Sequence, residues 1–559
     1  MAVIRRFGTT GAVQVGAVLV LGFLAGLGSL TNELSYDDRA LLLRPSLVNA
    51  DLLHLVSTSY WEEVTGHPDG LYRPLTLLWL CLLYHAGSGS TLLMHLGTLL
   101  AHLAAAVCLR WAARRQGISA LTATLAAMLF AVHPATTEVV NTLVGSGDAW
   151  ALTLGLGALA LATGRDPRLQ SVAVVALLLA PLAKESALLG TLAFGLWRWC
   201  QCRDVRDPLM LAAVFATLVP VMLRWGVTGQ LGAGTIGFVD NPLAHATTGV
   251  RLSMGATIPI RYANLIAFPW PLSADYSYDQ LPLPAWGIGW GLGRAVVGLG
   301  LVTSIGFLAY RCGRMGKDVF WGALAGGQIL LVSQVVMPIG TLFAERLAYP
   351  LAAVSCLGVG ACLASLRQPL RVPVITGWLA IGVVLSLARS AQWQDDLSLF
   401  TSTAAISDRS AKAHRGLAQA LQERGQLAEA VASYDRALAI YPRFSDAQYN
   451  RAIALTGLKR WTEARAGYLR VLASRPDHVD ALWAVAVLTE QLNGFESAIE
   501  PYRRLLQRDP GHLGAIRALV VGWVRSGDRA RARDLIEETA RTWDVPALRD
   551  LLVQLSAGS

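Results

Sequence analysis

Charged residues are scarce in this sequence, and their scarcity argues against an ordinary soluble protein. Asp, Glu, Lys and Arg make up 15% of the 559 residues, hydrophobic residues make up 54%, and the mean hydropathy is +0.45. Soluble globular domains carry about 25% charged residues. The formal charge of +9 is spread in small basic groups between apolar stretches, without the single basic stripe of a nucleic-acid-binding protein. We therefore expect a membrane protein with no nucleic-acid partner.

Cysteine is also scarce, and the seven that are present lie in or beside apolar segments. Their spacing shows no disulfide framework and no set of zinc ligands. Cys200 and Cys202 form an isolated C-x-C pair, which is more simply a chance pairing than a metal site. The sequence gives no indication of a structural metal in this region.

Long apolar runs dominate the first 390 residues. Those that approach the roughly 20 residues needed to cross the hydrocarbon core are 11–30, 91–111, 119–132, 149–162, 209–223, 288–310, 319–337, 347–366 and 372–387. A shorter pair, 172–183 and 187–199, forms either two short spans or a re-entrant hairpin. The sequence therefore predicts about eleven crossings.

The distribution of basic residues orients these crossings. Every second loop between the apolar runs is basic, whereas residues 133–147 contain no Lys or Arg. Because cytoplasmic loops carry an excess of Lys and Arg, we expect a cytoplasmic N-terminus, and an odd number of crossings then places the C-terminal part outside. The predicted external loops include residues 31–90 and about 227–287, within which 249–268 lies at or dips into the membrane surface.

A 34-residue repeat follows the apolar part. Pro442, Pro476 and Pro510 are each separated by 34 residues, which is the period of tetratricopeptide (TPR) repeats. The same register holds small residues and aromatic residues: Ala430, Ala464, Ala498, Ala532, Tyr434, Tyr468 and Tyr502. We expect an all-α chain, with a polytopic helical membrane domain over 1–390, a linker over 391–410, and a TPR solenoid with a C-terminal cap over 411–559.

Ionisable residues gather at the predicted outer ends of the helices. Asp37 and Asp38 follow the first apolar run, where they either mark the water interface or serve as a general base or metal ligand. The other candidates together suit an anionic lipid headgroup, and they are Arg73, His133, Glu138, Asp148, Lys184, Glu345 and Arg346. Taken singly, the adjacent opposite charges at 184–185 and 345–346 are more simply interpreted as mutual ion pairs.

The order of these motifs resembles the transmembrane and tetratricopeptide repeat-containing O-mannosyltransferase family, and the composition resembles that of a bacterial relative. The motifs are Tyr36-Asp37-Asp38, Tyr72-Arg73-Pro74-Leu75, the run 129–134 with Glu138, Lys184-Glu185, Ala344-Glu345-Arg346 and Trp393-Gln394-Asp395-Asp396. The resemblance covers almost the whole chain. One departure is Gly145-Ser146-Gly147-Asp148, where the family tends to have Gly-Arg-Ala-Asp, and it leaves the donor sugar open.

The resemblance implies a C-type integral-membrane glycosyltransferase. Such an enzyme would transfer a hexose, mannose in animal members, from a polyprenyl phosphate to Ser or Thr hydroxyls of a protein on the non-cytoplasmic side, with inversion. It also implies Asp37 as the base with Asp38 supporting it, and Arg346, Arg73 and Lys184 near the phosphate. Metal dependence stays open, although we expect that no divalent metal is required.

The TPR groove is expected to recruit the protein acceptor. Candidate contacts are Tyr449, Asn450 and Trp483, although Trp483 could equally pack between helices. An alternative is a non-catalytic scaffold whose repeats organise an envelope protein complex. A transporter is less favoured, because the ionisable residues gather at outer helix ends and not near the membrane midplane.

Overall fold

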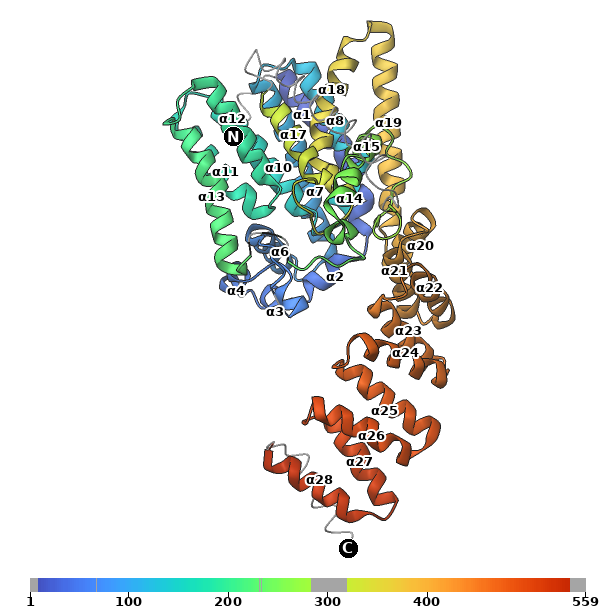
Figure 1. Ribbon diagram of the computed structural model, residues 1–559. Helices are drawn as coiled ribbons and strands as arrows, with labels where there is room; N and C mark the ends of the chain where they lie inside the picture. Colours follow the sequence, from blue (N-terminus) through green and yellow to red (C-terminus); the bar gives the residue numbers. More distant parts are fainter. Residues whose placement is uncertain (1–8, 67, 231, 233, 283–318, 543–559) are drawn as a thin grey trace. The chain divides into compact units, whose positions relative to one another are not determined.

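The computed structural model describes residues 9–66, 68–230, 232, 234–282 and 319–542. Within these ranges every regular element is a helix and none is a strand, so the predicted all-α fold is confirmed. The chain forms two compact units, Met1–Ser410 and Ala411–Ser559 (Figure 1). Each unit is described separately below.

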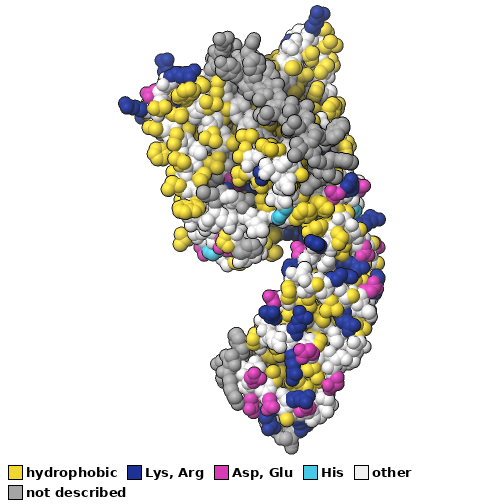
Figure 2. All heavy atoms as spheres, in the orientation of Figure 1, with side chains coloured by type: hydrophobic (Ala, Val, Ile, Leu, Met, Phe, Trp, Pro, Cys, Tyr) yellow, Lys and Arg dark blue, Asp and Glu magenta, His cyan; other side chains and the backbone are white. Residues whose placement is uncertain are grey.

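Five helical segments among the described residues are long and apolar enough to cross a membrane. They are Gly11–Thr31, which joins α1 (Thr9–Gly26) to η2 (Leu27–Thr31), α7 (Thr91–Arg115), α13 (Pro208–Thr228), Glu345–Ser365, which joins η5 (Glu345–Ala348) to α18 (Tyr349–Ser365), and α19 (Gln368–Gln392). The pair α8 (Ala120–Ala131) and η3–α9 (Pro134–Thr136 and Thr137–Asn141) bends by 58° and can form a sixth. These helices fit a membrane protein, and Figure 2 shows hydrophobic side chains over much of the visible face of the first unit.

Several expected spans correspond to shorter helices. The runs 149–162, 172–183, 187–199 and 319–337 fall on α10 (Ser146–Ala162), α11 (Pro167–Ala183), α12 (Ala187–Cys202) and α17 (Val319–Ser333). The run 288–310 lies outside the described residues, so the count of about eleven crossings stays a prediction. The segment 31–90, which the sequence predicts to be one external loop, contains an apolar helix that is not among the expected spans, α6 (Pro74–Ala86), which packs on α7 and α11.

Small residues bring these helices close together. A Cβ atom at Gly360 of α18 would lie 2.9 Å from the Thr122 carbonyl oxygen and 3.0 Å from the Ala126 nitrogen of α8. Likewise, a Cβ atom at Gly382 of α19 would lie 3.0 Å from the Val132 carbonyl oxygen. Such contacts supply the van der Waals packing that drives association of helices in lipid. They also fix α18 and α19 against α8.

Short helices form the segments that connect the long helices. The loop after η2 holds α2 (Asp37–Leu42), α3 (Pro45–Val48), α4 (Leu52–Ser57) and α5 (Glu62–Thr65). The loop after α13 holds η4 (Pro242–His245), α14 (Thr248–Gly255) and α15 (Ile258–Ala267), so residues 249–268 form two helices that are too short to span. The segment 391–410 contains α20 (Asp396–Ile406) and belongs to the first compact unit.

The second unit is a series of paired helices in the predicted repeat register. They are α21 (Ala411–Glu423), α22 (Leu427–Ile440), α23 (Ser445–Gly457), α24 (Trp461–Ser474), α25 (Val479–Asn493), α26 (Phe495–Arg508), α27 (Leu513–Arg525) and α28 (Arg529–Thr542). Ala430, Ala464 and Ala498 are fully buried, which allows the helices of a pair to approach closely. The buried Tyr502 also donates through its hydroxyl to Glu490 Oε2 at 2.6 Å. The TPR region is thus confirmed.

Candidate functional site

The two adjacent carboxylates at the start of α2 have different environments. Asp38 is fully buried, and its carboxylate accepts hydrogen bonds from the backbone N–H groups of Leu143 at 2.8 Å and Val144 at 3.2 Å. Burial raises the pKa of Asp38 to about 7, and the charge of Asp37 adds to this rise, whereas the two backbone hydrogen bonds oppose it. Asp37 is partly exposed. Asp38 therefore anchors the loop, and Asp37 is the more exposed carboxylate of the two.

Arg346 is held by Glu138. Its backbone N–H and its Nη1 donate to the two carboxylate oxygens of Glu138, at 2.7 and 2.8 Å. Glu138 is buried, whereas the Arg346 side chain keeps 24% of its surface exposed. Besides Glu138, the acidic charges that act on Arg346 include Asp37 and Asp148. A partly exposed guanidinium therefore lies within electrostatic reach of the candidate base.

Lys184 and Asp148 form a buried ion pair, and the charge of Arg346 acts on both residues. Their side chains are 6% and 3% exposed, and Lys184 Nζ contacts Asp148 Oδ2. Burial lowers the pKa of Lys184, and the positive charges of Arg73 and Arg346 act in the same direction, whereas Asp148 raises it. The position of α10 that carries Asp148 is tightly packed, since a Cβ atom at Gly147 would lie 2.9 Å from Thr76 Oγ1.

The departure from the family motif at position 146 fits this packing. Ser146 is fully buried, and its hydroxyl donates to the Leu143 carbonyl oxygen at 2.6 Å. At the preceding position, a Cβ atom on Gly145 would lie 2.4 Å from the Val139 carbonyl oxygen. The turn before Asp148 is therefore built from small residues, and in this chain the cations near Asp148 come from other segments.

Arg73 is fixed by Glu185 and by an aromatic ring. Its Nε donates to Glu185 Oε2 at 2.9 Å, and its guanidinium lies 4.9 Å from the centre of the Tyr60 ring. Glu185 also accepts a hydrogen bond from the Tyr72 backbone N–H at 3.2 Å. Tyr60 is fully buried, and its hydroxyl has no hydrogen-bond partner among the described residues. Sequence reasoning missed Tyr60, because a lone tyrosine in a loop has no distinguishing pattern.

The adjacent opposite charges do not pair with each other. Lys184 and Glu185 bind Asp148 and Arg73, respectively, and the same division occurs at 345–346. Glu345 is fully buried with Arg389, whose Nη2 lies 3.2 Å from Glu345 Oε2. The interpretation of these neighbours as mutual ion pairs is therefore wrong, because consecutive side chains point to different elements.

Two candidates are fully engaged with protein atoms. His133 Nδ1 accepts from the Ala135 N–H at 3.2 Å, so Nε2 must carry the proton and donate to the Ile266 carbonyl oxygen at 3.0 Å. Glu345 accepts from the Ser273 N–H at 2.6 Å and from the Tyr276 hydroxyl at 2.9 Å, besides its contact with Arg389. These contacts suit a role in holding segments together better than the ligand-binding role that the sequence suggests.

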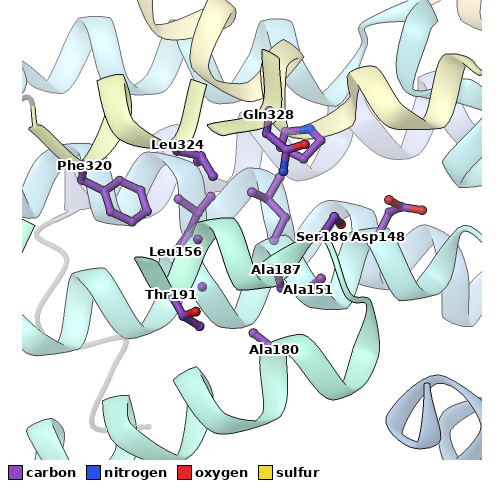
Figure 3. A pocket seen from close by; sticks show the side chains of 14 residues that line it. Asp148, Ala151, Leu156, Ala180, Ser186, Ala187, Thr191, Phe320, Leu324 and Gln328 are labelled. Atoms are coloured by element: carbon purple, nitrogen blue, oxygen red, sulfur yellow. The ribbon is translucent and has the colours of Figure 1, made fainter. Parts of the chain in front are cut away.

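An apolar cavity begins at Asp148. Its walls come from α10, α11, α12, α17 and α18 and include Leu152, Leu156, Phe320 and Leu324. Figure 3 shows Asp148 at one end of this cavity and Phe320 toward the other. The end at Asp148 therefore adjoins the Lys184 ion pair, and the rest is mostly apolar, with Ser186, Thr191 and Gln328 as further polar side chains. Among the described residues, no group of three His, Cys, Asp or Glu side chains forms a metal site.

In the second unit, two of the acceptor candidates pack between repeats. The Tyr449 ring stacks on His478 with centres 4.8 Å apart, and the Trp483 ring lies 5.0 Å from that of His512. These pairs are related by the 34-residue period. Both aromatic side chains, and Asn450 next to Tyr449, remain partly exposed. Trp483 thus has the packing contact that the sequence left as an alternative.

An apolar multi-helix unit followed by TPR helices defines a membrane protein with a repeat domain. The tetratricopeptide repeat family model matches residues 421–487. The chain is 25% identical over 439 residues to a protein O-mannosyl-transferase of Caenorhabditis elegans, covering 75% of this chain and 62% of that protein. It is 35% identical over 136 residues to the protein O-mannosyl-transferase Tmtc1 of Drosophila melanogaster, covering 23% of this chain and 15% of that protein. The resemblance to O-mannosyltransferases that the motifs predict is confirmed by these relatives, whereas the bacterial origin stays a prediction.

The comparisons cover only part of each relative. The chain spans less than two thirds of the length of the two O-mannosyl-transferases that it matches. Among solved structures it is similar to YrrB, described as a TPR protein with an unusual peptide-binding site, with 16% identity and a TM-score of 0.25, covering 30% of this chain and 84% of that chain.

Proposed function

We propose that this protein is an integral-membrane glycosyltransferase that transfers a hexose, mannose by analogy with its named relatives, from a polyprenyl-phosphate sugar to Ser or Thr hydroxyls of a protein. Transfer takes place on the non-cytoplasmic side, and the TPR repeats recruit the acceptor. The distribution of basic loops supports this sidedness, since the candidate residues lie in the loops that are poor in Lys and Arg.

The observation that carries the proposal is the convergence of opposite charges at the polar end of an apolar cavity. Asp37, Asp148, Lys184 and Arg346 come from four separate segments and interact electrostatically. Their arrangement suits a ligand with an anionic head, which the cations can neutralise. The cavity at Asp148 has a volume of only about 30 Å³, so a hydrocarbon tail would lie outside it, against the apolar faces of the helices. A polyprenyl-phosphate sugar has this chemistry.

The chemistry assigned to these residues is a single displacement. Asp37 accepts the proton of the acceptor hydroxyl, and the oxygen attacks the anomeric carbon as the bond to the lipid phosphate breaks. The phosphate leaves with the electron pair, and its charge is stabilised by Arg346, with Arg73 and Lys184 nearby. Glu138 keeps the Arg346 guanidinium oriented before substrate binds. Asp38 supports Asp37 by anchoring the loop.

The test is sugar transfer by the purified full-length protein in lipid nanodiscs. The donor is radiolabelled polyprenyl-phosphate mannose, and the acceptor is a pool of extracytoplasmic proteins. Wild type should transfer label and Asp37→Asn should lose transfer, because an amide cannot take the proton. Asp51→Asn is the matched control, since Asp51 is an exposed acid of the same loop whose helix-capping role asparagine can also fill.

Each outcome has a defined meaning. Loss in Asp37→Asn with retention in Asp51→Asn supports both the reaction class and the base. Equal activity of all three proteins would show that Asp37 is not the base. If wild type transfers no label from mannose or glucose donors, the proposal of hexose transfer fails, and if an arabinose donor also gives no label, the transferase class fails with it. A complex captured through the TPR unit would then favour the scaffold.

A further inference from the structure

Helix α20 is bonded to the loop that carries the two aspartates. The Tyr36 backbone N–H donates to Asp396 Oδ1 at 2.8 Å, and Arg39 Nη1 lies 3.1 Å from Asp396 Oδ2. Nearby, the Glu33 N–H donates to the Gln394 carbonyl oxygen at 2.8 Å, and the Tyr36 and Phe400 rings lie 5.8 Å apart. These contacts flank Asp37 and Asp38 on both sides.

The same segment is bonded to the loop that supports Arg346. The Ser407 and Ser273 hydroxyls are 2.7 Å apart, and the Ser410 hydroxyl bonds to Asp275. The Ser273 backbone N–H in turn donates to Glu345 Oε1 at 2.6 Å. Residues 394–410 therefore connect to the acidic side of the candidate site directly, and to its cationic side through one intermediate loop.

Asp396 contacts the loop at Tyr36, where the backbone has an unfavourable conformation. Tyr36 has a φ angle of +57°, in the left-handed region, which residues with a side chain seldom occupy. The conformation of Tyr36 determines the direction in which α2 begins and thus where Asp37 points. A carboxylate that accepts the Tyr36 N–H and pairs with Arg39 one turn later can hold this conformation on two sides.

We propose that Asp396 is a positioning residue of the transfer site, which through Tyr36 and Arg39 keeps Asp37 within electrostatic reach of Arg346. The catalytic part of this inference rests on the proposed function, whereas the structural part does not. Asp396 acts on Asp37 through the loop, by its contacts with Tyr36 and Arg39, and its charge also adds to the rise that burial causes in the pKa of Asp38.

The experiment compares Asp396→Ala, Asp396→Asn and Asp395→Asn with wild type as full-length proteins in nanodiscs. Asparagine at 396 keeps an oxygen that can accept the Tyr36 N–H, but it loses the negative charge that forms an ion pair with Arg39. Asp395→Asn is the control, because Asp395 caps α20 by accepting from the Ser398 N–H, which asparagine also does. Two properties are measured, namely hydrogen exchange of the amides in residues 33–42 and the kcat and KM of sugar transfer.

The proposal predicts a graded effect. Amides 33–42 should exchange faster in Asp396→Ala than in wild type or Asp395→Asn, with Asp396→Asn between them. In the same order kcat should fall, by about a hundredfold in Asp396→Ala, while KM for the lipid donor stays within about twofold, because Arg346 and the cavity are unaltered. A general loss of folding would instead raise exchange throughout the first unit and change kcat and KM together.

The two proposals fail separately. Unchanged exchange of residues 33–42 in Asp396→Ala would overturn the positioning role whether or not the protein transfers sugar. Wild-type activity in Asp396→Ala, with Asp37→Asn inactive, would overturn it and leave the transferase intact. Absence of transfer by wild type itself would refute the proposed function, and the exchange result would then decide the structural role alone.

Discussion

Replacing Lys184 by methionine should destabilise the first unit strongly, because it isolates a buried carboxylate. The Lys184 and Asp148 side chains are 6% and 3% exposed and contact each other directly. Methionine has a length similar to that of lysine but carries no charge. The substitution therefore removes the partner of Asp148 without leaving a large cavity.

The magnitude follows from the burial of the pair. Removing one partner of a buried ion pair costs about 3 to 5 kcal/mol, because the remaining charge is left uncompensated away from water. Replacing both partners with apolar residues is often neutral. Asp148 borders a small apolar cavity, so a leucine at 148 would contact apolar neighbours. The double variant Lys184→Met/Asp148→Leu should therefore recover most of the loss and lie within about 1 kcal/mol of wild type.

The assay is thermal unfolding of the detergent-solubilised protein, followed by tryptophan fluorescence. We expect Lys184→Met to lower Tm by several degrees and the double variant to restore it. Both variants should be inactive in sugar transfer, since each removes a cation from the proposed phosphate site. Equal Tm values for Lys184→Met and wild type, or a double variant less stable than the single one, would refute the assignment of a compensated buried pair.

Three further predictions concern pH, orientation and the repeats. Burial raises the pKa of Asp38 from 3.8 to about 7. The protonated carboxyl therefore contributes fully to the stability of the folded state below pH 3.8, and this contribution is lost as pH rises through about 7. The difference in Tm between wild type and Asp38→Asn should shrink between about pH 5.5 and 8. Glu138→Ala should raise KM for the donor, and it should cost about 1.5 to 3 kcal/mol of stability for each hydrogen bond lost to Arg346. Glu138→Gln should recover part of the stability and part of the affinity for the donor. Trp483→Ala should make the C-terminal unit of the full chain more sensitive to limited proteolysis, by removing the His512 contact worth about 1 kcal/mol beyond its buried area; unchanged cleavage would contradict the packing role.

Helix content and repeat register could be predicted because they depend on local pattern. Pro442, Pro476 and Pro510 alone define the 34-residue period, and the helix pairs follow it. Apolar runs likewise identify helices, since a stretch of hydrocarbon side chains is a property of consecutive residues. The lengths were less predictable: the run at 149–162 belongs to the 17-residue α10, whose first turn includes Ser146 and Asp148.

The candidate site could be predicted as a set of residues but not as a set of pairs. The sequence places Lys184 beside Glu185, yet the partners are Asp148, 36 positions away, and Arg73, 112 positions from Glu185. Arg346 binds Glu138 across 208 positions. Asp396 was visible only as part of a motif, because nothing local shows that it bonds to Tyr36.

The sequence by itself therefore determined that this protein is helical, apolar over its first part and repetitive over its second. These properties depend on composition and on the periodicity of residues close together in the sequence. Only the tertiary structure decided which carboxylate is buried, which is exposed, and which cation forms an ion pair with each. Hydrogen bonds and ion pairs act over a few ångströms of space, and the packing of helices far apart in the chain determines which side chains come that close.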